Sequence, residues 1–160
     1  MKQLYMPIPA IVLTLLAILA NYHSAVAEMP PSSFSLLMSL LFILGWIFMV
    51  IFSIKYYYTV VLFFFSIFWF ACFIFCTIPA FIVAFDTIPF DFMQITNAIF
   101  VSPLYGIRDF LSALWTYIAS AGFSVLMAII CFLCSRRKGD SLPKEKRKRK
   151  KRTPKTPSLQ

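Results

Sequence analysis

Charged residues are almost absent from the first 135 positions of this 160-residue chain, and their absence limits its possible folds. Only seven of the 21 charged residues lie there, and four intervals between them carry no charge: 3–27, 29–54, 56–85 and 110–135. A helix or strand of a soluble domain needs polar residues on its solvent-facing side, and these intervals cannot supply them. The pattern predicts an all-α integral membrane protein.

Four apolar segments lie within the predicted membrane domain, residues 1–135. Crossing about 30 Å of hydrocarbon takes roughly 20 helical residues. The segments of suitable length are about 6–27, 34–54, 59–84 and 110–134.

The first apolar segment admits two interpretations. Lys2, the apolar run that starts at Leu4 and the triplet Ala25-Val26-Ala27 before Glu28 are typical of a signal peptide with an A-x-A cleavage site. The run of 17 residues is slightly longer than the usual apolar region of about 7–15 residues, which favours an uncleaved helix. We therefore expect four transmembrane helices, or three if the first segment is removed.

The distribution of basic residues predicts the orientation. Twelve of the 15 Lys and Arg residues follow the last span, and basic residues beside membrane helices stay mainly on the cytoplasmic side. Working back from a cytoplasmic C-terminus, Lys55 and Lys2 are also inside, whereas Glu28 and residues 85–109 are outside. We therefore expect a multi-pass protein of the cell membrane with both ends in the cytoplasm.

The segment between the third and fourth spans, residues 86–109, is too long for a tight turn and too apolar for a solvated loop. Its polar residues Asp91, Gln94 and Asn97 recur at every third position. This spacing predicts a short amphipathic helix over about 90–101, lying at the exterior membrane interface.

The sequence also predicts how this helix joins the last span. Ser102-Pro103 is expected to end it, and Tyr105-Gly106 is expected to form the turn that follows. Asp109 is placed to act as the N-cap of the last span. The alternative is an apolar segment that re-enters the membrane and packs on the helix bundle.

Small residues recur on one face of the last span. Such residues let helix backbones approach closely, which is how helices associate in lipid. The face is expected to pack inside its own bundle or, alternatively, against a membrane-protein partner or a second copy of the chain. The third span is ringed by Phe, lacks such a face and is expected to face lipid. The helix-packing face consists of Ala113, Thr116, Ser120, Ser124 and Ala128.

Residues 136–160 form a polybasic cytoplasmic tail that is expected to be disordered, because it has no hydrophobic periodicity and contains three prolines. Each basic residue near an anionic leaflet contributes about 1 kcal/mol of attraction. No aromatic residue follows Phe132, so no specific nucleic-acid binding is expected. The alternative is a topogenic signal without another role. The residues expected to contact anionic lipid are Lys144, Lys146, Arg147, Lys148, Arg149, Lys150, Lys151 and Arg152.

Few residues could carry catalysis or bind a metal ion. His23 is the only histidine, the four glycines are isolated, and no charged residue lies inside a span. These features argue against a metal centre, a nucleophilic triad, a phosphate-binding loop and a proton relay. We therefore expect no enzyme activity and no cofactor.

Cys131 and Cys134 form the only Cys-x-x-Cys pair, a spacing that activates thiols in redox proteins. Here the pair lies in an apolar run, and apolar surroundings disfavour the thiolate. Cys72 and Cys76 lie near mid-membrane. All four cysteines are expected to pack as small hydrophobic residues, with palmitoylation of Cys134 as an alternative.

Three functions remain compatible with the sequence. The leading hypothesis is a small non-enzymatic accessory or assembly component that acts through helix packing and its lipid-binding tail. The second is a subunit of an oligomeric channel or exporter. The third is a membrane thiol oxidoreductase that uses Cys131 and Cys134.

Overall fold

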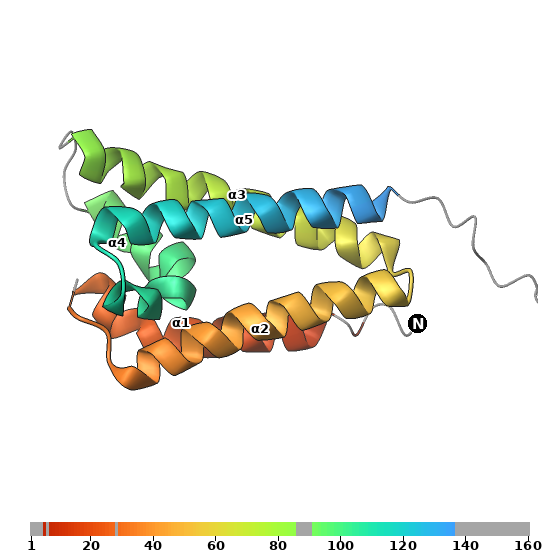
Figure 1. Cartoon of the computed structure of the whole chain (residues 1–160), viewed down its shortest axis with the longest axis horizontal. Helices are drawn as coiled ribbons and strands as arrows, with labels where there is room; N and C mark the ends of the chain where they lie inside the picture. Colours follow the sequence, from red (N-terminus) through yellow and green to blue (C-terminus); the bar gives the residue numbers. More distant parts are fainter. Residues whose placement is uncertain (1–4, 6, 28, 86–90, 137–160) are drawn as a thin grey trace, which may run out of the picture.

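The computed structural model describes residues 5, 7–27, 29–85 and 91–136, and within these ranges it contains helices and no strands (Figure 1). Four helices are long and apolar enough to cross a membrane, as the sequence predicts. They are α1 (Pro7–Val26), α2 (Ser33–Lys55), α3 (Thr59–Phe85) and α5 (Ala113–Ser135).

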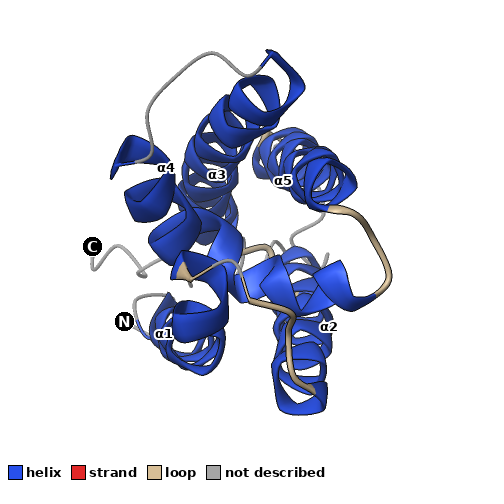
Figure 2. Cartoon of the chain, turned by 90° about the vertical axis from the view of Figure 1, so that its left-hand side faces the viewer, coloured by secondary structure: helices blue, strands red, loops and turns tan. Residues whose placement is uncertain are grey.

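The four long helices form two pairs (Figures 1 and 2). Helix α1 lies beside α2, and α3 packs along α5. Three short elements join α3 to α5 and lie at one end of the bundle, in contact with both pairs. They are α4 (Asp91–Thr96), the π-helix η2 (Asn97–Val101) and the 3₁₀-helix η3 (Ser102–Asp109).

Small side chains bring α1 and α2 together. Ala10, Ala17 and Ala25 of α1 are buried, and a Cβ added to Gly45 of α2 would lie 2.4 Å from the Leu13 side chain. The indole N–H of Trp46 donates to Thr14 Oγ1 at 3.2 Å, which links the two helices through their side chains. Small residues and interhelical hydrogen bonds are what holds helices together where lipid offers no hydrophobic contrast.

Aromatic rings fill the space between the two pairs. The Trp69 ring of α3 lies 5.0 Å from the ring of Trp46, 6.0 Å from Phe42 and 5.2 Å from Phe123 of α5. Phe68 stacks on Trp46 at 5.1 Å. Offset and edge-on ring contacts of this kind add about 0.5–1.5 kcal/mol each beyond the area that they bury.

The expectation that the third span faces lipid without a packing face is wrong. Helix α3 buries one side of its length, including Leu62, Phe65, Trp69 and Cys76, against the rest of the bundle. Other aromatic side chains of the same helix, such as Phe70, stay exposed. The rings of α3 therefore serve both the core and the outer surface.

The segment before α5 also differs from the prediction. The helical turns do not end at Ser102-Pro103, because η3 continues to Asp109 with proline in its first turn, and Tyr105-Gly106 is part of η3. Asp109 does not cap α5, which begins at Ala113 with Ser112 as its N-cap residue. Proline suits the first turn of a helix because the N–H that it lacks has no partner there.

The short elements pack into the bundle. Asn97 and Val101 of η2 and Tyr105 of η3 are 0–1% exposed, whereas Ile95 and Ile99 point outward. Burial of the polar Asn97 is the reverse of what an amphipathic helix on a water interface would do. The short elements therefore pack on the bundle, and an interfacial position of the helix over about 90–101 stays a prediction.

Candidate functional site

A buried polar network joins α1, α2 and η3. Ser39 Oγ of α2 accepts hydrogen bonds from Asn21 Nδ2 at 3.2 Å and from the backbone N–H of Gly106 at 3.0 Å. Asn21 and Ser39 are both fully buried. Because a polar group without a partner is costly in an apolar interior, these bonds fix where η3 sits against the two helices.

Gly106 lies at the closest approach in this network. A Cβ at this position would be 2.3 Å from the carbonyl oxygen of Ser35 and 2.7 Å from Cα of Leu36. Those atoms belong to the backbone of α2 and cannot rotate away. Glycine is therefore required here by a backbone-to-backbone contact.

Further hydrogen bonds hold the segment formed by η2 and η3. Ser102 Oγ donates to the carbonyl oxygen of Ile18 at 3.2 Å, and Asn97 Nδ2 donates to the Tyr117 hydroxyl at 3.1 Å. Arg108 Nη1 donates to the Tyr105 hydroxyl. The segment is thus tied to α1, α2 and α5.

Two acceptors of this network have no partner among the residues that the structure describes. They are the side-chain oxygens of Asn21 and Asn97. Each could accept a hydrogen bond from water or from a polar ligand. The network therefore places two amide oxygens without a described partner inside the helix bundle.

The sequence alone does not identify this network as a site. Asn21 and Asn97 are amide side chains in otherwise apolar surroundings, and polar residues at membrane depth usually pair with one another or with the backbone. Asn21 lies inside a predicted span, so its amide could have been recognised as a group that needs a partner. Its partner Ser39 could not be chosen from the sequence, because four serines occur in α2 and all can bond to their own helix.

The helix-packing face of α5 points into the bundle. Thr116, Ser120, Ser124 and Ala128 are 1–5% exposed, and Ala113 is half-buried. The Ser66 hydroxyl of α3 donates to the carbonyl oxygen of Ala128 at 3.1 Å. The structure therefore brings this face against the chain's own helices.

The cysteines lie among apolar side chains. Cys131 and Cys76 are fully buried, Cys72 is 6% exposed, and Cys134 is half-buried. Cys76 Sγ donates a weak hydrogen bond to the carbonyl oxygen of Phe100 at 3.7 Å. All four are free thiols. This environment fits a packing role and gives Cys131 no route to a redox partner in water.

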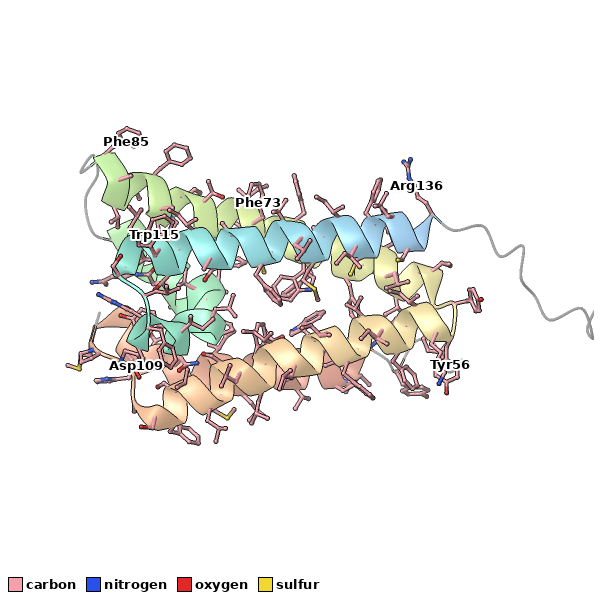
Figure 3. The ribbon with its side chains drawn as sticks, viewed as in Figure 1. Tyr56, Phe73, Phe85, Asp109, Trp115 and Arg136 are labelled. Atoms are coloured by element: carbon pink, nitrogen blue, oxygen red, sulfur yellow. The ribbon has the colours of Figure 1, made fainter. Side chains whose placement is uncertain are left out.

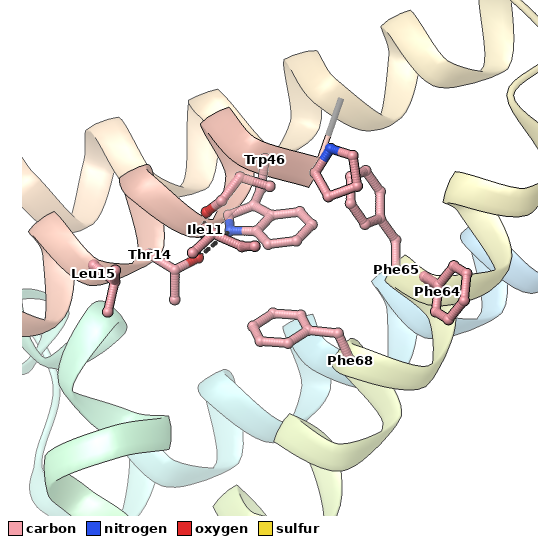
Figure 4. A pocket seen from close by; sticks show the side chains of 9 residues that line it. Ile11, Thr14, Leu15, Trp46, Phe64, Phe65 and Phe68 are labelled. Atoms are coloured by element: carbon pink, nitrogen blue, oxygen red, sulfur yellow. Dashed lines mark hydrogen bonds between the residues drawn. The ribbon is translucent and has the colours of Figure 1, made fainter. Parts of the chain in front are cut away.

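An apolar cavity of about 270 Å³ lies between α1, α2 and α3 (Figure 4). Phe65 and Phe68 line one side, Ile11 lines another, and the hydrogen-bonded pair of Trp46 and Thr14 contributes its polar atoms. Such a cavity can hold an apolar group and offers no side chain for acid–base or nucleophilic chemistry.

Other predicted features fall elsewhere in the chain. In the described ranges, no group of three or more His, Cys, Asp or Glu side chains could hold a metal ion. The eight basic residues predicted to contact anionic lipid, from Lys144 to Arg152, lie outside the described residues. Comparison of the chain with protein-family models, curated proteins and solved structures found no match.

Proposed function

We propose that this chain is a non-enzymatic multi-pass protein of the cell membrane, acting as an accessory or assembly component through its packed helices and its basic tail. One observation carries the proposal: an apolar four-helix scaffold ends directly in a strongly basic segment. Side chains such as Leu19, Phe48 and Leu133 are 60–73% exposed on the outside of the scaffold. Exposed apolar surface of this extent suits lipid rather than water.

The arrangement of the helix ends supports a cytoplasmic C-terminus. Tyr56 and Arg136 lie at one end of the bundle, whereas Phe85, Asp109 and Trp115 lie at the other (Figure 3). Lys55 precedes Tyr56, so its end of the bundle is also the end from which the basic tail leaves. Basic residues concentrate on the cytoplasmic side of membrane proteins. The short elements α4, η2 and η3 are then on the exterior side.

The contacts of α1 support its retention as a transmembrane helix. Asn21 bonds to Ser39, and the carbonyl oxygen of Ile18 accepts from Ser102. Cleavage after Ala27 would remove both partners, so that Ser39 would keep only its bond from the Gly106 N–H and Ser102 would lose its acceptor. We therefore propose four spans with both ends in the cytoplasm.

Reporter fusions test this orientation. A reporter inserted at Asn97 is expected to be active outside the cytoplasm, and one at the C-terminus is expected to be active inside, because the basic tail is retained there. A fusion after Lys55 serves as an internal control and is expected to match the C-terminal result. An exterior C-terminus would contradict the proposed orientation.

Binding of the tail to lipid tests the functional part of the proposal. A peptide of residues 136–160 is expected to bind vesicles that contain phosphatidylglycerol, ignore neutral ones and dissociate as salt rises, because screening acts over roughly 8 Å at physiological salt. Replacing Lys150 and Lys151 by Gln should weaken binding about 30-fold, at about 1 kcal/mol for each residue.

A peptide with the same residues in shuffled order is the matched control for the tail. It should bind as well as the natural one, because the attraction depends on charge rather than on order. Loss of binding on shuffling would instead identify a docking motif for a specific partner.

The oligomeric-channel alternative gains no support from the packing. A pore between copies needs polar side chains on an outer helix face, and Thr116, Ser120 and Ser124 point into the chain's own bundle. The thiol oxidoreductase alternative needs both thiols of the pair to be accessible, and Cys131 is fully buried while Cys134 is half-buried.

A further inference from the structure

A groove runs between α3 and α5 on the outer surface of the bundle. Its hollow nearest to the end of α5 has a volume of about 380 Å³ and is lined by residues of these two helices alone, including Phe63, Phe70, Val125 and Ile129. A second hollow of about 330 Å³ lies farther along the same two helices. Volumes above about 300 Å³ are typical of ligand-binding pockets.

The lining of the first hollow is apolar. Its one hydroxyl belongs to Ser66 and is already bonded to the carbonyl oxygen of Ala128. Ile129 is 51% exposed, so the groove opens toward the surroundings of the helices. The hollow therefore suits a hydrocarbon chain.

The guanidinium of Arg136 lies at the end of the groove. Phe132 is part of the lining, and the guanidinium of Arg136 lies 4.5 Å from the centre of its ring. Arg136 is itself exposed and follows the last residue of α5 (Figure 3). This cation–π contact holds the guanidinium beside the groove, and its N–H donors have no hydrogen-bond partner among the described residues, so they can bind an anion.

We propose that the groove binds one anionic phospholipid, with an acyl chain between α3 and α5 and the phosphate on Arg136. Charge complementarity selects this occupant, because a guanidinium binds phosphate oxygens in pairs and because net negative charge on the lipid adds attraction. This inference rests on the proposed function, in which the end of α5 that carries Arg136 is cytoplasmic. It adds one specific lipid site to the non-specific attraction of the basic tail.

Native mass spectrometry of the purified full-length chain tests the site, with phosphatidylglycerol and phosphatidylcholine as probes. The unaltered chain is expected to retain one phosphatidylglycerol in preference to phosphatidylcholine. The substitution Ile129→Trp fills the groove and should abolish that preference. Leu126→Trp is the matched control, because Leu126 is equally apolar and 56% exposed but does not line the groove.

Two further variants separate the groove from the tail. Arg136→Gln should lower phosphatidylglycerol affinity about fivefold, which corresponds to about 1 kcal/mol for one basic residue. Replacing the eight basic residues between Lys144 and Arg152 by Gln should leave the single retained lipid in place.

Three results would overturn the groove site. In the first, the preference disappears on neutralising the tail and survives Ile129→Trp and Arg136→Gln; the tail proposal would then stand alone. In the second, the unaltered chain shows no preference, and both proposals fail. In the third, Ile129→Trp converts a dimer into a monomer, which would assign the groove to a second copy of the chain.

Discussion

Replacing Gly106 by alanine is expected to lower the free energy of unfolding by about 3 kcal/mol, the upper end of the usual cost of overpacking. The added methyl group would lie 2.3 Å from the carbonyl oxygen of Ser35, and the α2 backbone cannot move aside without separating from η3. Such a shift would also break the 3.0 Å hydrogen bond from the Gly106 N–H to Ser39. Unfolding in mixed detergent micelles, followed by circular dichroism during an SDS titration, measures the change.

The other described glycines supply graded controls for this prediction. Gly122 has no atom within 4 Å of an added Cβ and lies in α5, so Gly122→Ala should stabilise the protein by about 0.5–1 kcal/mol through helix propensity. Gly45→Ala would meet the end of the flexible Leu13 side chain and should have an intermediate effect. Equal stability of the Gly106 and Gly122 variants would contradict the placement of η3 against α2.

Replacing Trp69 by alanine is expected to destabilise the protein by roughly 3–4 kcal/mol, within the range for large-to-small core substitutions. Trp69 is 1% exposed and has ring contacts with Phe42, Trp46 and Phe123, besides its neighbour Phe68. Lipid is as apolar as the core, so the loss comes mainly from ring contacts and from the cavity that remains. The same SDS titration reports it.

Trp115→Ala is the matched control for this effect. Trp115 belongs to α5 and is 61% exposed, so the same substitution there removes little packing. Its expected change is within about 0.5 kcal/mol, as for other surface positions. If both variants lost the same stability, α3 would not have the buried face that the fold assigns to it.

The sequence by itself determined the number and the approximate bounds of the apolar helices. The second and third spans were predicted at 34–54 and 59–84, and the helices extend over Ser33–Lys55 and Thr59–Phe85. These bounds could be predicted because the length of an apolar run and the charges at its ends are local properties, set by the thickness of the hydrocarbon layer. The last span was predicted to start at 110, and α5 starts at Ala113, because Asp109 and Ser112 are both good N-cap residues.

The tertiary structure alone decided which faces of these helices are buried. In a soluble protein, polar residues mark the outer side of a helix and leave the buried side to be read by contrast. Here both sides are apolar, so nothing in the spacing separates the buried Trp69 from the exposed Phe70.

The position of η3 could not be predicted either, because the helices that it packs against are likewise apolar on both sides. Gly106 resembles a turn residue in the sequence, and only its contact with the Ser35 backbone gives it another role. Lipid and protein core are equally apolar, and helix association therefore depends on shape and on a few hydrogen bonds, which become visible only when the helices are placed together.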